Sequence, residues 1–173
     1  NGWLSRNTYR NICTIAIRLQ RLEEAKKITI EYKDLLRQDD RESAYHFNLA
    51  NMAFSEKNYD EAIELSHKAL EVDPNYAVQY AMLAEIYYDL HDFERSWSEI
   101  ERAYEISPDS FQVLLTYGTF LMMDKKIDKA ISFLERAASA NPDSYVVHYN
   151  LSQAYLRKND LKRHYIHNKE IFR

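Results

Sequence analysis

Three side chains near the C-terminus have the types and the spacing that could bind a metal ion. His164, His167 and Glu170 follow one another at intervals of three residues. On a helix, that spacing would bring two imidazoles and a carboxylate towards one face, and first-row metal ions accept these donors. The spacing is loose, however, and three cationic side chains occupy the same segment. We therefore expect a solvated helix face and predict no metal site.

Residue types that serve as nucleophiles or build phosphate-binding loops occur only in isolation. Cys13 is the single cysteine, so no intramolecular disulfide can form, and no neighbouring motif marks it as a nucleophile rather than a small core residue. Glycine occurs only at Gly2 and Gly118, so the sequence has no glycine-rich phosphate loop. A glycosylation sequon begins at Asn150, but the next residue, Leu151, has the phase of a buried position. These observations predict no catalytic residue, no cofactor and no enzymatic activity.

Composition argues against two other classes of protein. The chain has 23 Lys and Arg against 27 Asp and Glu, and a net charge of −4 does not favour a nucleic-acid binder. Its 14 tyrosines could stack on the bases of a single-stranded nucleic acid. Many of them, however, have the phase of packing positions, so core packing is the preferred interpretation. No apolar run is long enough to span a membrane.

The compartment is weakly indicated. A single cysteine suits a reducing environment, so the cytoplasm is slightly favoured while the localisation stays unknown. The N-terminal residues contain neither an initiator Met nor the apolar core of a signal peptide. We therefore expect that the sequence can be a piece of a longer protein from which a signal peptide is missing.

The elements that position all these residues follow an internal repeat. The three prolines, Pro74, Pro108 and Pro142, are spaced by 34 residues. Small side chains recur with the same spacing at three positions of the repeat: Ala50, Ala84, Gly118 and Ser152; Ala62, Ser96 and Ala130; and Ala69, Ala103 and Ala137. Small residues at fixed positions let two helices approach closely, where larger side chains would force them apart.

Each repeat contains two stretches with helical spacing of apolar residues, which predicts two amphipathic helices joined by a short turn. Asn58 and Glu61 have the offset of a capping box at the start of the second helix. Proline follows that helix because it cannot donate an interior helical hydrogen bond. Asn75, Asp109 and Asp143 come next, and we predict that they cap the following helix.

One helix pair of this length cannot bury both its faces, whereas stacked pairs can. The alternative is a globular bundle with accidental periodicity. The stretch "AYHFNLANMAFSEKNYDEAIELSHKALEVDPN", residues 44–75, resembles the tetratricopeptide repeat. By this resemblance, repeats cover residues 43–76, 77–110 and 111–144. Residues 145–173 resemble a divergent repeat or C-terminal cap, or else a truncated repeat whose edge another segment covers. The predicted fold is all-α, a right-handed α-solenoid of stacked antiparallel helix pairs.

Residues 1–42 match the repeat least well. Extending the 34-residue spacing towards the N-terminus places Ala16 at the position of Ala50, and Ile28 at the position of Ala62. The stretch "RLEEAKKITIEYKDLL" still has the pattern of an amphipathic helix. We predict a divergent helical hairpin that continues the stack.

In the family that the sequence resembles, the first helix of each repeat lines a concave groove that binds peptides or helices. Here these helices are expected around residues 44–55, 78–89, 112–123 and 146–157. The side chains assigned to the groove, and hence to peptide binding, are Phe47, Asn48, Asn51, Glu85, Leu115, Thr119, Met123, Tyr149, Asn150, Gln153 and Arg157. Amides among them can hold a peptide backbone, and large apolar side chains can anchor a ligand. The alternative for each is a role in hydrogen bonding or packing inside the array.

Some members of the family bind the free C-terminal carboxylate of heat-shock chaperones with a clamp of Lys, Asn, Asn, Lys and Arg. The corresponding residues here, starting at the first clear repeat, are Phe47, Asn51, Met82, Gln112 and Thr116. All three cations are therefore absent, and a charge-assisted grip on a carboxylate needs them. The sequence favours an internal segment as ligand rather than a chain terminus.

Together, the resemblance and the lack of catalytic motifs predict a non-catalytic protein–protein interaction scaffold that binds a peptide or helix segment in the concave groove. The alternative is a regulatory or targeting arm of a larger multidomain enzyme or signalling protein. A third class, an array that self-associates through its exposed ends, also stays open. The expected partner is a protein or peptide, with no nucleic acid and no membrane span.

Overall fold

The computed structural model describes residues 5–35 and 38–171, and the regular elements in this part of the chain are all helical. They are α1 (Arg6–Arg18), α2 (Leu22–Glu31), the 3-10 helix η1 (Lys33–Leu35), α3 (Gln38–Ser55), α4 (Tyr59–Val72), α5 (Ala77–Asp89), α6 (Phe93–Ile106), α7 (Phe111–Met123), α8 (Ile127–Ala140), α9 (Tyr145–Arg157) and α10 (Leu161–Glu170). The chain divides into two compact units, residues 1–96 and 97–173, and the division falls within α6.

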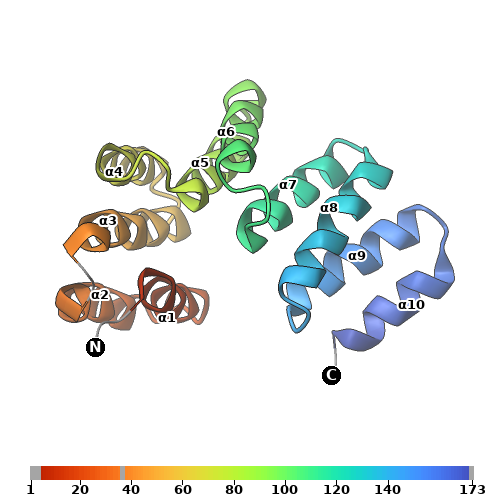
Figure 1. Ribbon diagram of the computed structural model, residues 1–173, viewed down its shortest axis with the longest axis horizontal. Coiled ribbons are helices and arrows are strands. Elements are labelled where there is room, and N and C mark those ends of the chain that lie inside the picture. The colour runs from red at the N-terminus through yellow and green to blue at the C-terminus, as the bar shows by residue number, and fades with distance from the viewer. Residues whose placement is uncertain (1–4, 36–37, 172–173) are drawn as a thin grey trace. The chain divides into compact units, whose positions relative to one another are not determined.

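The first unit is a stack of helix pairs. The pairs α1–α2 and α3–α4 each pack as a hairpin, α3 also contacts α1 and α2, and α5 packs on α4 and α3 (Figure 1). Polar side chains join the pairs as well as apolar ones. Buried Gln79 of α5 donates a hydrogen bond to Ser66 of α4 at 2.6 Å, and Ser66 donates to the carbonyl of Ala62 at 2.6 Å. Each pair therefore supplies part of the surface that the next one covers.

The second unit repeats this arrangement. The pairs α7–α8 and α9–α10 are hairpins, α8 packs on α9, and α7 contacts α9 (Figure 1). Its core is centred on Leu114, Leu134 and Leu151, which are almost fully buried, and on Tyr155. No helix within the described residues is long and apolar enough to cross a membrane.

The turns between the two helices of a pair share one geometry. Among residues 5–35 and 38–171, five non-glycine residues have positive φ, namely Gln20, Lys57, His91, Lys125 and Asn159, with φ between 56° and 61°. In each turn, the N–H of the following residue donates to the carbonyl five residues earlier, at 2.9 Å. This is the hydrogen bond of a Schellman motif, which satisfies a carbonyl at the end of the helix. The last four of these residues are spaced by 34.

The N-terminal hairpin is out of the predicted register. Gln20 precedes Lys57 by 37 residues, not 34, so the turn lies three residues earlier than the regular spacing requires. Ala25, and not Ile28, is therefore the fully buried counterpart of Ala62. The prediction that aligned Ile28 with Ala62 was wrong. The physical reason is that the link between α2 and α3, which includes η1, is longer than the links between later pairs.

The three prolines lie between helix pairs, and the backbone oxygen of each accepts a side-chain hydrogen bond. Tyr80 Oη donates to the Pro74 oxygen at 3.1 Å, Arg136 donates to that of Pro108 at 2.8 Å, and His148 Nε2 contacts that of Pro142 at 2.7 Å. Each proline thus ends one helix pair and also fixes its turn to a side chain of the fold.

The predicted helix caps do not form as expected. Asn58 is at the N-cap of α4, but its side chain makes no capping hydrogen bond and instead donates to Glu61 Oε2 at 2.6 Å. Asn75, Asp109 and Asp143 each lie one residue before the N-cap of the next helix, so they do not cap it. The helices α4, α5, α7 and α9 begin without a side-chain capping hydrogen bond, so packing against neighbouring helices stabilises them instead.

The predicted small residues lie where the helices cross. All ten members of the three series are buried. Gly118 shows the constraint most clearly, because a Cβ built there would lie 2.8 Å from Cγ of the fully buried Leu134. The recurrence of small side chains is therefore explained by the close approach of α7 and α8. The repeat boundaries themselves stay a prediction.

The shared turn geometry predicts the effect of a single substitution. Lys57 is exposed and holds a left-handed backbone that a side chain with Cβ disfavours. Lys57→Gly removes that penalty, and we expect the free energy of unfolding to rise by about 0.5–1 kcal/mol. Urea denaturation measures this change. Lys57→Ala is the matched control, since it keeps Cβ and should give no gain; an equal gain for both variants would contradict the proposed cause.

Candidate peptide-binding surface

In the first unit, the predicted groove residues of α3 are engaged inside the stack. Phe47 is buried against Tyr76, with ring centroids 5.4 Å apart. Asn51 Nδ2 donates to Thr14 Oγ1 on α1 at 3.2 Å. This hydrogen bond joins the first helices of two neighbouring pairs. Asn51 therefore has a structural partner, and its part in peptide binding stays a prediction.

Asn48 and Glu85 occupy different environments in the same unit. Asn48 on α3 is fully buried beside Tyr9. Burial raises the pKa of Tyr9 to about 12, and its hydroxyl donates to the carbonyl of Thr29 at 2.6 Å. Glu85 on α5 is half-buried. A ligand could reach Asn48 only if the helices around it moved.

In the second unit, the predicted residues form two adjoining stripes. Leu115, Thr119 and Met123 follow one another at intervals of four on α7, and so do Tyr149, Gln153 and Arg157 on α9. Two hydrogen bonds set the register: Asn150 Nδ2 donates to Thr119 Oγ1 at 3.1 Å, and Arg157 donates to the carbonyl of Met122 at 3.0 Å. From the first bond to the second, the residue number increases on both helices, so α7 and α9 run parallel.

We call the surface made by Leu115, Thr119, Met123, Tyr149, Gln153 and Arg157 the α7–α9 face. Met123 is 50% exposed and Tyr149 is 53% exposed, whereas Leu115 is buried. Gln153 on the same face is half-buried, and its side-chain amide carries both a hydrogen-bond donor and an acceptor. Each stripe extends over about two turns of helix, roughly 12 Å, which matches about three or four residues of an extended peptide.

The sequence therefore located two separate groups of residues. The structure brings together the members that belong to α7 and α9, and it places Asn51 beside Thr14 rather than in a free position. Arg157 has its guanidinium partly engaged by the Met122 carbonyl while the residue stays exposed. Whether these residues bind a peptide stays a prediction.

The histidines that suggested a metal site are used differently. His164 Nδ1 lies 3.0 Å from the carbonyl of Ser152 on α9, and His167 Nδ1 lies 3.1 Å from Nδ1 of His148. They hold α10 against α9. Among the described residues, no group of three His, Cys, Asp or Glu side chains could hold a metal ion.

The contact between His148 and His167 fixes where their protons lie. The carbonyl of Pro142 can only accept, so His148 donates to it from Nε2. In neutral His148, Nδ1 is then an acceptor, and His167 Nδ1 is the donor. The ring of His167 also stacks on Tyr155 at a centroid distance of 5.6 Å. His148 was not among the residues predicted from the sequence, although it has the same repeat position as Tyr80, which donates to the Pro74 carbonyl.

The pKa of His167 is lowered, first by its burial and then by repulsion from His148. Glu135 on α8 and Glu170 on α10 act in the opposite direction, and Arg163 adds to the lowering. The neutral form of His167 is therefore the one that the folded protein prefers.

Two parts of the chain match models of a known repeat family. A tetratricopeptide repeat model matches residues 43–76, and a second tetratricopeptide repeat model matches residues 121–163. The stacked helix pairs agree with both matches. The chain therefore contains tetratricopeptide repeats at these two places, and its predicted all-α solenoid class is confirmed.

Two curated proteins are similar to most of this chain at low sequence identity. The Hsp70-Hsp90 organising protein of Plasmodium falciparum is 24% identical over 148 residues, which cover 82% of this chain and 24% of that protein. Anaphase-promoting complex subunit 3 of Schizosaccharomyces pombe is 21% identical over 115 residues, which cover 66% and 17%. The chain thus spans a quarter or less of the length of these relatives.

Solved structures share the fold at low identity. TTC0263, a thermophilic TPR protein of Thermus thermophilus, aligns with a TM-score of 0.73 and 18% identity, covering 96% of this chain and 89% of that one. PilF of Pseudomonas aeruginosa aligns with a TM-score of 0.68 and 17% identity, covering 96% and 74%. YrrB is described as a TPR protein with an unusual peptide-binding site. It aligns with a TM-score of 0.58 and 18% identity, covering 95% of this chain and 83% of that one.

The lowered pKa of His167 predicts a pH dependence of stability. Its folded pKa lies below the ordinary 6.5, so the unfolded chain binds the proton more readily. The contribution of His167 to stability is therefore complete above pH 6.5 and is lost as the pH falls below it. Thermal unfolding between about pH 8 and about pH 5 should show a smaller loss on acidification for His167→Gln than for the natural protein.

His67→Gln is the matched control, because His67 is exposed on α4 and outside this contact. His46 also has a pKa lowered by burial, so it too contributes to the pH dependence of the natural protein. The effect of His167 is therefore measured as the difference between the natural protein and the variant, and not from the curve of the natural protein alone. NMR titration of the His167 imidazole provides an independent check. A midpoint for His167 above 6.5 would contradict the assignment.

Proposed function

We propose that this chain is a non-catalytic protein-interaction scaffold that binds a partner's peptide or helix segment on its first helices. One observation carries the proposal: the α7–α9 face presents the half-exposed apolar side chains of Tyr149 and Met123 together with the amide of Gln153. Apolar anchors with interspersed donors and acceptors are what an amphipathic or extended peptide requires.

The family supports a role in binding proteins or peptides. Of the curated relatives, one is named an Hsp70-Hsp90 organising protein and the other a subunit of the anaphase-promoting complex. YrrB is described as having a peptide-binding site. These descriptions concern the other proteins, and they make a peptide or protein segment the first ligand class to test here.

The alternative function is a regulatory or targeting arm of a larger protein. It is favoured by one observation, namely that the chain covers only 24% and 17% of the two curated relatives. Both functions use the same surface, since a targeting arm also binds a protein partner. The sequence of any flanking segment distinguishes them.

The α7–α9 face predicts which substitution weakens binding. A phage library of random peptides is selected on the intact chain, and the enriched peptides are titrated against purified variants. Tyr149→Ala removes an exposed anchor, and we expect it to weaken binding by about 1–2 kcal/mol, roughly a factor of ten. More than half of the Tyr149 side chain is exposed, so the variant should stay folded.

Tyr165→Ala is the matched control. Tyr165 is 69% exposed, lies on α10 and is no part of the α7–α9 face. Enriched peptides that bind the natural protein and Tyr165→Ala but lose affinity for Tyr149→Ala support the proposal. Equal binding to all three proteins would place the ligand elsewhere and contradict it.

The similarity to a chaperone-organising protein makes chaperone tails a sharp test. In this chain, buried Phe47 and buried Thr116 occupy clamp positions where the resemblance requires Lys and Arg. We expect no micromolar binding that depends on a free terminal carboxylate, because no charge-assisted contact is available there. Fluorescence anisotropy with chaperone-tail peptides that carry free and amidated ends measures this. Micromolar binding that amidation abolishes would show that a clamp exists.

A further inference from the structure

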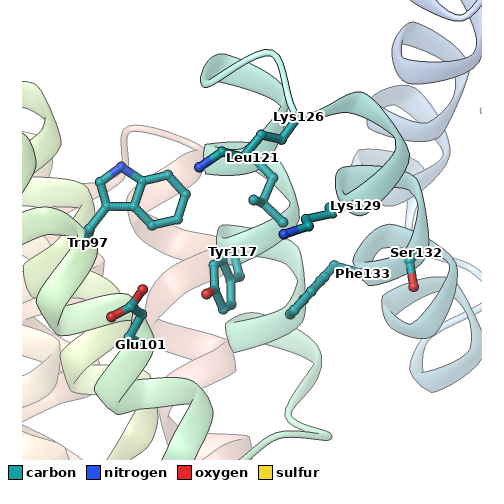
Figure 2. Close-up of a pocket in the computed structure, with 8 residues that line it drawn as sticks. All are labelled: Trp97, Glu101, Tyr117, Leu121, Lys126, Lys129, Ser132 and Phe133. Carbon is teal, nitrogen blue, oxygen red and sulfur yellow. The ribbon is translucent and has the colours of Figure 1, made fainter.

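A pocket of about 590 Å³ opens in the second unit, between α6 and α8 and over α7 (Figure 2). Its volume is within the range of pockets that bind ligands. We call it the Trp97 pocket. Its walls include Trp97 and Glu101 from α6, Tyr117 from α7, and Phe133 from α8. The pocket is separate from the α7–α9 face, because its walls come from α6 and α8 instead of α9.

The floor of the Trp97 pocket is aromatic. The rings of Tyr117 and Phe133 pack with centroids 4.6 Å apart, and the edge of Trp97 meets Tyr117 at 5.8 Å. Leu121 closes the floor between them and is buried. All three rings are only half-buried, so the pocket presents aromatic surface that no described residue covers. Such a surface is suited to bury one large apolar side chain.

The rim of the Trp97 pocket carries separated charges. Lys126 pairs with Asp124 at 2.7 Å and lies over the ring of Trp97, with Nζ 5.4 Å from its centroid. Lys129 makes no ion pair or hydrogen bond with the described residues. Figure 2 shows both amines on one side of Tyr117 and the carboxylate of Glu101 on the other. A ligand carboxylate would therefore meet Lys129.

The corresponding seam in the first unit has the opposite charge. A smaller pocket of about 250 Å³ there is lined by Leu49, Ala53 and Glu61, each 68 residues before a residue of the Trp97 pocket, which is twice the repeat spacing. Glu61 thus stands at the position of Lys129, and it is already engaged by Asn58 Nδ2 at 2.6 Å. The free amine is a feature of the Trp97 pocket and not of the repeat.

We propose that the Trp97 pocket is a second docking site, for a peptide segment in which a large apolar side chain lies next to an acidic one. The apolar side chain rests on Tyr117 and Phe133, and the acidic side chain pairs with Lys129. Glu101 on the far side accepts a hydrogen bond from a backbone N–H of the same peptide. The unpaired amine of Lys129 favours an acidic side chain at this point of the peptide over a basic one.

The proposal is independent of ligand binding on the α7–α9 face. The two surfaces share no residue, so loss of one site leaves the other intact. A partner that used both would gain affinity from bivalent attachment without any new contact.

The test uses the intact chain and a defined probe, the hexapeptide acetyl-Gly-Ser-Glu-Phe-Ser-Gly-amide. NMR spectra of the 15N-labelled protein are recorded at increasing peptide concentrations up to millimolar. We expect saturable shifts of the Trp97 indole N–H and of the backbone amides of Lys129 and Ser132. Two matched peptides, with Glu replaced by Lys and with Phe replaced by Ala, should shift these signals less.

The charge-reversal variant Lys129→Glu gives the decisive comparison. Lys129 is exposed in the first turn of α8, where a carboxylate favours the helix, so the variant should fold. It should bind the acidic peptide about fivefold more weakly or worse and prefer the lysine-containing peptide. Lys162→Glu on α10 has the same change of charge outside the pocket and should behave as the natural protein.

Three outcomes would overturn the proposal: no shift of the pocket signals at millimolar peptide, shifts centred on the α7–α9 face or in the first unit, or equal affinity of the natural protein and Lys129→Glu for the acidic peptide. Saturation at the pocket with the expected reversal of preference supports it. Because the probe is read at assigned residues, failure here is distinguishable from failure of the proposed function.

Discussion

Each helix pair in this protein has more apolar surface than it can bury by itself, so it depends on the next pair. The small buried residues at the crossings make that dependence possible, because they allow the helix backbones to come close. At Gly118 the approach is so close that a Cβ would lie 2.8 Å from Cγ of Leu134. A stack built in this way is held by contacts between neighbours rather than by one central core.

The same constraint decides what the polar residues of the first helices do. Asn51 donates to Thr14, Asn150 donates to Thr119, and His148 contacts the carbonyl of Pro142. These bonds link successive pairs or fix the turns between them, where a buried polar group without a partner would be costly. The side chains that stay accessible to a ligand are those that packing leaves exposed, such as Tyr149 and Met123.

Two surfaces of the second unit differ in the kind of ligand that they suit. The α7–α9 face combines half-exposed apolar residues with an amide, and the Trp97 pocket combines three packed aromatic rings with the unpaired amine of Lys129. Their residues lie on different helices, so changes in one need not alter the other. Tetratricopeptide-repeat proteins bind other proteins or peptides. If both proposed surfaces bind, one partner would attach at two places or two partners would attach at once.

The sequence by itself determined the helix pairs and the small residues at their crossings, because these follow from a local pattern repeated every 34 residues. It did not determine the register of the N-terminal hairpin, where a longer link shifts the turn to Gln20. It also carried no sign of the Trp97 pocket or of the contact between His148 and His167. Only the tertiary structure decided these, because it brings Trp97 of α6 and Lys129 of α8 to the same pocket, and no periodic pattern along a chain specifies which side chains stay uncovered.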